Sequence, residues 1–154
     1  MTTTMTANSL RVSRIIQATP DALFAAWTEP AQLRKWWRMD GEGWSTSETT
    51  LDLRVGGKYR LGMLGPDGAS HIAIGEYREV RRPTRLVFTW EWEDPTQSVG
   101  ATIVTIDFKD VGNGATEVVL THEGFGDEKK VAGHEKGWTQ LLKLLDGVSG
   151  ASVS

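Results

Sequence analysis

The chain has 154 residues, a length typical of one domain that buries a sizeable core without disulfide bonds. Hydrophobic residues make up 39% and charged residues 24% of the chain, which excludes a wholly disordered protein. The net charge of −3 has the wrong sign for a dedicated nucleic-acid or anionic-membrane binder. The absence of cysteine excludes disulfides, thiol nucleophiles and thiolate metal sites. The unusual feature is seven tryptophans, more than the two tyrosines and four phenylalanines together.

Small polar residues dominate both ends of the chain, and no linker interrupts the interior. We therefore expect flexible tails at residues 1–9 and 148–154 around a single domain at residues 10–147. No apolar run approaches the roughly 18 residues that a membrane span needs. The start of the chain lacks the basic and apolar regions of a secretory signal. We expect a cytoplasmic protein that is monomeric or homodimeric.

The first predicted element is a strand over Leu10–Gln17, which is rich in leucine, valine and isoleucine. Thr19 and Pro20 then form a helix start, because threonine caps an N-terminus and proline suits the first helical position. This helix runs through Trp27. A second helix start at Pro30 predicts another short helix, so two short helices follow the first strand.

From Trp44 onward the pattern changes to strands separated by turns. The clearest alternation places Leu86, Phe88, Trp90 and Trp92 on one face of a strand, with mostly polar residues on the other. Glycine and asparagine at 112–114 predict a tight hairpin turn. Six strands are expected here, at residues 50–55, 58–64, 70–80, 85–93, 102–108 and 116–122.

The longest helical pattern covers Asp127–Asp146, with one apolar stripe and with Gly147 placed to end it. Gly133 and Gly137 interrupt this pattern, and each costs about 1 kcal/mol in a helix interior, so something packs closely against them or the first half is irregular. An antiparallel sheet with one apolar face needs a cover, which only this helix is long enough to supply. The expected α+β architecture is a curved antiparallel sheet of about seven strands wrapped around a long C-terminal helix.

No motif for catalysis, cofactor binding or metal binding is complete. The segment from His134 begins like the zinc-protease pattern H-E-x-x-H, but Trp138 occupies the position of the second ligand. The chain has no G-x-S-x-G elbow and no phosphate-binding glycine loop. We predict no metal, no cofactor and no assigned catalytic residue. Convergence of His122 and His134 on one site remains an open alternative.

Two basic segments raise the question of a charged partner. Arg34–Arg38 mixes cations with two tryptophans, a combination that also binds single-stranded nucleic acid. In a net acidic chain such rings more often pack inward, and we predict no nucleic-acid binding. Arg78, Arg81, Arg82 and Arg85 surround one turn, where they form either a solvated loop or a docking site for an acidic partner.

Large aromatic side chains fall on elements that should face each other, the strand at 85–93 and the C-terminal helix. Such rings, with glycines in the opposing helix, either line a cavity for an apolar ligand or form a solid core. The alternation leaves both interpretations open. The candidate ligand-binding residues are Trp37, Trp44, Met63, Phe88, Trp90, Trp92, His122, Trp138 and Leu142.

Several segments, in order over residues 10–146, resemble one known family. They are Ala18-Thr19-Pro20, 23–30, Trp36-Trp37, 52–59, 75–77, 85–90, Thr121-His122-Glu123-Gly124-Phe125 and Gly137-Trp138. Together they resemble the heat-shock-protein-90 ATPase activator-like proteins, a branch of the START-like SRPBCC superfamily. The resemblance implies the helix-grip fold, with a cavity between sheet and long helix. Members of the superfamily bind lipids, sterols or polyketides, a few catalyse cyclisation or hydrolysis, and the eukaryotic namesake stimulates a chaperone.

From the aromatic faces and this resemblance we expect a protein that binds a small hydrophobic ligand, apolar or aromatic, between sheet and helix. A protein-interaction or chaperone-associated module is the first alternative, through the basic segments described above. A cyclase- or hydrolase-type enzyme is the second alternative, with His122 or Glu123 as acid or base.

Overall fold

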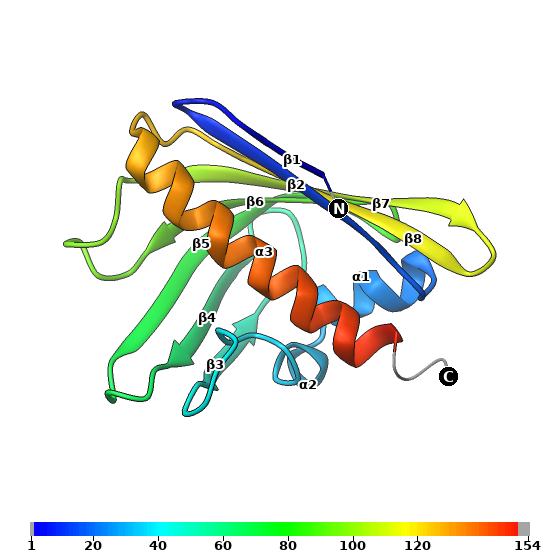
Figure 1. Ribbon diagram of the computed structural model, residues 1–154, viewed down its shortest axis with the longest axis horizontal. Coiled ribbons are helices and arrows are strands. Elements are labelled where there is room, and N and C mark those ends of the chain that lie inside the picture. Colours follow the sequence, from blue (N-terminus) through cyan, green and yellow to red (C-terminus); the bar gives the residue numbers. More distant parts are fainter. Residues whose placement is uncertain (1, 151–154) are drawn as a thin grey trace.

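The computed structural model describes residues 2–150, which form one antiparallel sheet of eight strands, two short helices and a long C-terminal helix (Figure 1). The strands lie in the order β1-β2-β8-β7-β6-β5-β4-β3, so β1 and β3 are the edges. The strands are β1 Thr2–Met5, β2 Ser9–Ile16, β3 Ser45–Leu51, β4 Lys58–Leu64, β5 Ser70–Arg81, β6 Arg85–Trp92, β7 Thr102–Gly112 and β8 Ala115–Glu123. The helices are α1 Pro20–Thr28, α2 Pro30–Leu33 and α3 Glu128–Gly150.

The helix-grip architecture is confirmed, because the sheet curves and α3 lies along one of its faces (Figure 1). The two short helices follow β2, and each begins with proline at its first position. Thr19 caps α1 by accepting a hydrogen bond from the Ala22 amide at 3.2 Å. The predicted hairpin turn joins β7 to β8, where Asn113 has a positive φ of 57°.

The structure differs from the expected elements at the edges of the sheet. Thr2–Met5, expected to be flexible, pairs with β2 as an eighth strand and satisfies backbone groups at that edge. The strand expected at 50–55 lies instead at Ser45–Leu51, because Asp52–Gly57 turn back on themselves. α3 continues through residues 148–150, where a tail was expected, and 151–154 lie outside the described residues.

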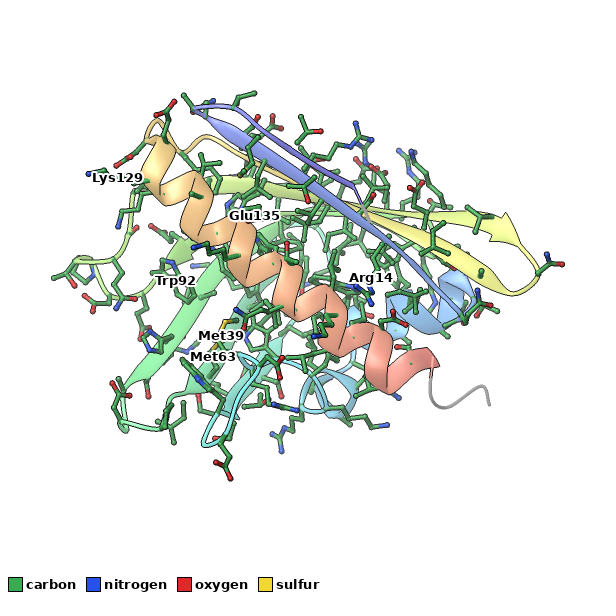
Figure 2. All side chains as sticks on the ribbon, viewed as in Figure 1. Arg14, Met39, Met63, Trp92, Lys129 and Glu135 are labelled. Carbon is green, nitrogen blue, oxygen red and sulfur yellow. The ribbon has the colours of Figure 1, made fainter. Side chains whose placement is uncertain are left out.

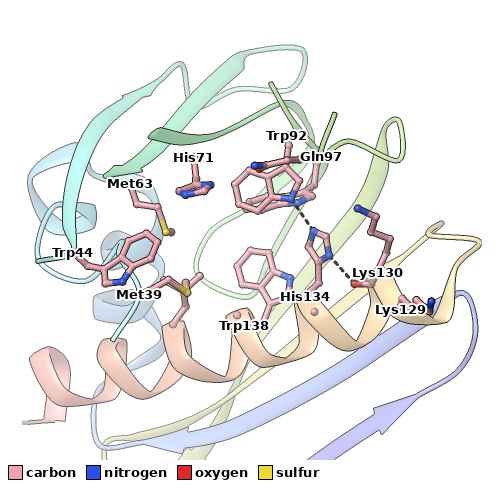
Figure 3. Close-up of a pocket in the computed structure, with 14 residues that line it drawn as sticks. Met39, Trp44, Met63, His71, Trp92, Gln97, Lys129, Lys130, His134 and Trp138 are labelled. Carbon is pink, nitrogen blue, oxygen red and sulfur yellow. Dashed lines mark hydrogen bonds between the residues drawn. The ribbon is translucent and has the colours of Figure 1, made fainter. Parts of the chain in front are cut away.

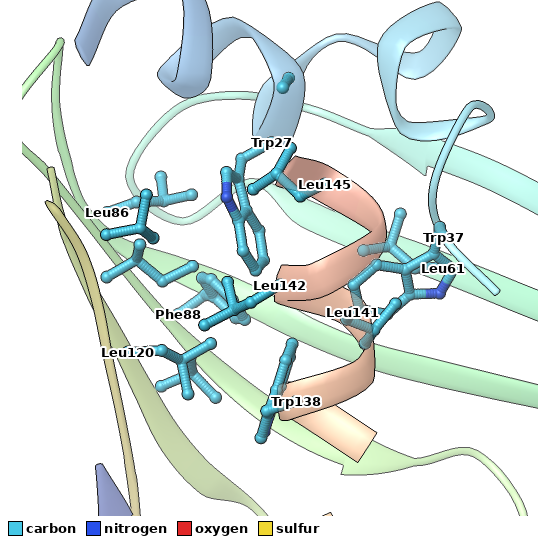
Figure 4. Close-up of a cluster of buried hydrophobic side chains, with 14 of the residues drawn as sticks. Trp27, Trp37, Leu61, Leu86, Phe88, Leu120, Trp138, Leu141, Leu142 and Leu145 are labelled. Atoms are coloured by element: carbon cyan, nitrogen blue, oxygen red, sulfur yellow. The ribbon is translucent and has the colours of Figure 1, made fainter. Parts of the chain in front are cut away.

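The core fills the space between α3, α1 and the centre of the sheet (Figure 4). Leu142 and Leu145 of α3 are fully buried among Phe88, Leu120 and Trp27. At the C-terminal end of α3, Arg14 of β2 forms an ion pair with Asp146 at 2.7 Å. The second half of α3 is therefore held both by apolar packing and by a charge pair.

Candidate functional site: a pocket under the long helix

A pocket of about 450 Å³ lies between the first half of α3 and the strands β4–β6 (Figure 3). Met39 and Met63 lie near the middle of α3, and Trp92 and Lys129 lie toward its N-terminal end (Figure 2). Aromatic, sulfur-containing and cationic side chains make up most of the wall. The residues that line the pocket are Met39, Trp44, Met63, His71, Trp90, Trp92, Gln97, Lys129, Lys130, Gly133, His134, Gly137, Trp138 and Leu141.

The pocket floor consists of four buried side chains, Met63, Trp90, Trp138 and Leu141, none more than 4% exposed. The Trp90 and Trp138 ring centroids lie 4.8 Å apart, so strand β6 and helix α3 meet directly at the floor. All four side chains are apolar over most of their surface. This floor favours an apolar or aromatic ligand.

The helix side of the pocket is a stripe of residues four apart, namely Lys129, Gly133, Gly137 and Leu141. A side chain added at Gly133 or Gly137 would meet no atom within 4 Å of its Cβ. The two glycines therefore leave space under the helix instead of accommodating a close contact. Both sequence interpretations are therefore wrong at these positions, because the helix is regular there and nothing packs closely against either glycine.

The pocket rim is partly exposed and contains most of the polar groups. The Trp44 ring packs against His71 with centroids 5.7 Å apart, and His71 in turn contacts Trp92 at 6.4 Å. Trp92 donates a hydrogen bond from Nε1 to Nε2 of His134 at 3.2 Å, which joins β6 to α3. The rim is thus a chain of aromatic contacts from the α2–β3 loop to the helix.

His134 is neutral in this arrangement. Its Nδ1 lies 2.8 Å from the Lys130 carbonyl oxygen, which only accepts, so Nδ1 carries the proton. Nε2 is then the acceptor for Trp92. Burial lowers the pKa of His134, and the neighbouring Lys130 charge lowers it further. Both ring nitrogens are therefore occupied by protein partners.

His122 lies behind the floor, outside the pocket lining. Its Nδ1 accepts a hydrogen bond from Trp138 Nε1 at 3.0 Å, so Nε2 carries the proton toward Thr102 Oγ1 at 2.6 Å. Thr102 Oγ1 accepts this hydrogen bond and in turn donates one to the Trp90 carbonyl oxygen at 2.7 Å. Burial lowers the pKa of His122 to about 2, with a smaller contribution from His134.

The two histidines do converge, with ring centroids 5.3 Å apart. Their nitrogens are occupied and their pKa values are lowered, so the geometry offers neither a free acid nor a free base there. Glu123 lies exposed at the end of β8. Within residues 2–150, no group of three or more metal-ligating side chains gathers.

Five of the nine candidate residues from the sequence line the pocket, namely Trp44, Met63, Trp90, Trp92 and Trp138. The other four, Trp37, Phe88, His122 and Leu142, are at most 4% exposed and belong to the core around it. Trp37, for example, packs against Trp90 and Trp138 from behind, with centroids 5.9 and 6.0 Å away. These four fill the layer that supports the floor and lie outside the pocket lining, so any part they have in ligand binding stays a prediction.

Sequence reasoning missed several lining residues, and most of them lie in loops or at the start of α3. They are Met39, His71, Gln97, Lys129, Lys130, His134 and Leu141. The spacing of Leu141 four residues after Gly137 was the one available signal, since both then share a helix face. Gln97 lies in the long connection between β6 and β7, whose course no periodicity predicts.

In the two basic segments, three arginines form ion pairs and two tryptophans are buried. Arg82 pairs with Asp21 at 2.9 Å, Arg81 with Glu79 at 2.9 Å, and Arg85 with Asp107 at 3.3 Å. Trp36 and Trp37 are 0% and 1% exposed, so their rings offer no stacking surface to a nucleic acid. The geometry therefore gives little support to stacking of a nucleic acid on the first segment, and three of the four arginines of the second segment already pair within the chain.

None of the helices within residues 2–150 combines the length and apolar character of a membrane span.

Comparison with known proteins identifies the family. The model of the family described as "Activator of Hsp90 ATPase homolog 1-like protein" matches residues 17–150. The chain belongs to this family. The expectation from the sequence motifs is thus confirmed. None of the curated proteins matches the chain.

Solved structures of family members and fold relatives resemble the chain over nearly its whole length. Protein CV1439 from Chromobacterium violaceum is 29% identical, with a TM-score of 0.82 over 93% of this chain and 97% of that one. The AHSA1 protein SPO3351 from Silicibacter pomeroyi is 29% identical, with a TM-score of 0.76 over 90% and 95%. PFC0360w, an HSP90 activator from Plasmodium falciparum, is 24% identical, with a TM-score of 0.71 over 92% and 95%, and shares the fold.

Proposed function

We propose that this family member binds a small hydrophobic ligand in the pocket under α3. The observation that carries the proposal is the pocket itself, an apolar space of about 450 Å³ floored by Trp90 and Trp138. Ligand sites of proteins range over roughly 300–1,000 Å³ and combine an apolar wall with a few polar groups. A cytoplasmic location and a monomeric or homodimeric state stay predictions from the sequence.

Two features separate this pocket from a packing defect. Trp138 of the floor and Trp92 of the rim each donate a hydrogen bond to a histidine, which fixes both rings, whereas Nε1 of the floor residue Trp90 has no partner among the described residues. The space is kept open by Gly133 and Gly137, although glycine weakens a helix by about 1 kcal/mol at each position. A chain that needed only stability would place larger helix formers there.

The test is a titration with apolar and aromatic compounds, followed by tryptophan fluorescence and by melting temperature. Because the lining contains Trp44, Trp90, Trp92 and Trp138, a bound ligand should change the emission and raise the melting temperature. Absence of any response to a broad panel, together with an experimental structure that shows the space filled by side chains, would contradict the proposal.

A matched pair of variants locates the binding. Gly137→Leu places a side chain in the pocket and should reduce affinity at least about tenfold. Gly147→Leu makes the same change on α3 outside the pocket, where a Cβ also meets nothing within 4 Å, and should leave affinity unchanged. Equal affinities for both variants would place the ligand elsewhere.

Association with an Hsp90-type chaperone is a second candidate function, favoured by the family to which the chain belongs. We expect any such role to use the outer surface, because the pocket is lined by inward-facing side chains. The measurement is the ATPase rate of an Hsp90-type chaperone from the same organism, with and without this protein. A rate that rises equally with wild type and Gly137→Leu supports this role independently of ligand binding, and an unchanged rate counts against it.

A further inference from the structure

The two ends of the pocket differ in chemistry (Figure 3). At one end lie Met39, Trp44, Met63 and Leu141, all apolar. At the other end, near the start of α3, lie the polar and cationic side chains of the lining. We call this second group the cationic end, and it consists of Gln97, Lys129, Lys130 and His134.

The distance between the two ends of the pocket follows from the lining residues of α3. From Lys129 to Leu141 there are twelve residue steps, which at 1.5 Å each span about 18 Å along α3. Gly133 and Gly137 lie between them and leave the middle open. A ligand whose body lies on the tryptophan floor can therefore reach the cationic end with a polar group at its tip.

The positive charge at the cationic end is not neutralised by the protein. Lys130 is half-buried and Lys129 is exposed, and neither forms an ion pair with any residue in the range 2–150. No aspartate or glutamate is among the lining residues of this pocket. Two ammonium groups beside an apolar pocket, with no carboxylate in its lining, favour an anionic ligand over a neutral or cationic one.

Three acidic groups in the segments that adjoin the cationic end have partners within the protein. Glu93 forms an ion pair with Arg60, and Asp94 accepts two hydrogen bonds from Thr96. Asp127, just before α3, accepts a hydrogen bond from the Lys129 amide at 2.9 Å. The positive end of the α3 dipole also lies here, where Asp127 and, in the first turn, Glu128 already offset it, so the preference for an anion depends on the lysines.

The lysines, together with the Gln97 amide, must supply the binding. His134 has no free donor, since its Nδ1–H is given to the Lys130 carbonyl and its Nε2 accepts from Trp92. Figure 3 shows the Lys130 side chain extending from α3 toward Gln97. A lysine ammonium has three donors and suits a compact anion such as a carboxylate.

We propose that the ligand is an amphipathic carboxylate, with its apolar or aromatic body on the tryptophan floor and its carboxylate at Lys129 and Lys130. This inference rests on the proposed ligand-binding function and adds the chemical class of the ligand. Neutral apolar molecules of the same shape bind more weakly, because they leave the two ammonium groups without a partner.

The test uses three compounds of nearly the same shape, 2-naphthylacetate, 2-naphthylacetamide and 2-(2-naphthyl)ethylamine, titrated calorimetrically at pH 7.5. We expect the carboxylate to bind about tenfold tighter than the amide, in line with one charge-assisted contact, and the amine to bind weakest. Raising the salt concentration should weaken binding of the carboxylate and leave the amide unchanged, since the lysines are only partly shielded from solvent.

A double variant, Lys129→Gln with Lys130→Gln, should lower the affinity for the carboxylate about tenfold, to that of the amide. The matched control is Lys136→Gln with Lys143→Gln, which removes the same net charge from exposed positions of α3 outside the pocket. Two results overturn the inference. One is equal binding of carboxylate and amide by wild type, and the other is an equal loss in both double variants.

These outcomes separate the inference from the proposed function. If the three compounds bind with equal affinity and Gly137→Leu weakens all of them, the pocket binds ligands but does not select an anion. If no compound binds and none of the wider panel binds, both the inference and the proposed function fail.

Discussion

At the scale of single residues, His122 makes folding depend on pH. Its folded pKa of about 2 lies below the ordinary value of 6.5, because burial disfavours the charged ring. The stability that it contributes is therefore fully present above pH 6.5 and is lost as the pH falls. We expect the free energy of unfolding to drop by about 1.4 kcal/mol per pH unit between pH 6.5 and 4.5, measured by urea denaturation.

His134 adds to this loss, since its pKa is also lowered by burial. The variant His122→Gln should be less stable at pH 7.5 but should show a shallower dependence on pH. Glu123→Gln, at the next position and exposed, should keep the slope of the wild type. A stability that stays constant from pH 6.5 to 4.5 would contradict the assignment.

Residue patterns predicted which side chains point inward but not how deep each one lies. Phe88, Trp90 and Trp92 share one face of β6, as their alternation indicated. Phe88 nevertheless packs against Tyr59 and Tyr77 in the core, whereas Trp90 and Trp92, further along the strand, reach the pocket. Depth depends on where α3 crosses the sheet, which is a tertiary property that strand periodicity does not contain.

At the scale of elements, two glycines lower the stability of α3 where it covers the pocket. Gly133 and Gly137 are helical and a Cβ would meet nothing within 4 Å, so each change to alanine should raise the free energy of unfolding by about 1 kcal/mol. Gly147→Ala should give a similar gain in stability. Ligand affinity should fall only for the two pocket positions, as measured by titration beside thermal or urea unfolding. A loss of stability in Gly137→Ala would mean that the space is already filled.

Among the elements, the centre of the sheet was predictable and its edges were not. Strands β4 to β8 carry alternating apolar residues because one face is buried against α3 and α1. β1 is held by backbone pairing with β2, and its described side chains are exposed, so no apolar pattern marks it.

The cationic end of the pocket forms where the β6–β7 connection and the first turn of α3 come together in space. Neither segment contains a motif that indicates this meeting.

At the scale of the whole molecule, the two halves of α3 are attached differently. The second half carries Leu142 and Leu145 in the core and the Arg14–Asp146 ion pair. The first half covers the pocket, with a hydrogen bond between His134 and Trp92 as one of its links to the sheet. Local opening should therefore be easier at residues 128–137 than at 138–148.

A bound ligand would add contacts to the first half, because it lies between that half and the sheet. In hydrogen exchange of the free protein, we expect amides of residues 128–137 to exchange faster than those of 138–148. A ligand present at 100 times its dissociation constant stabilises the folded state by about 2.7 kcal/mol and should slow exchange chiefly in that first half. Uniform exchange along α3, with or without ligand, would mean that the helix opens as one unit and that the pocket is not its weak point.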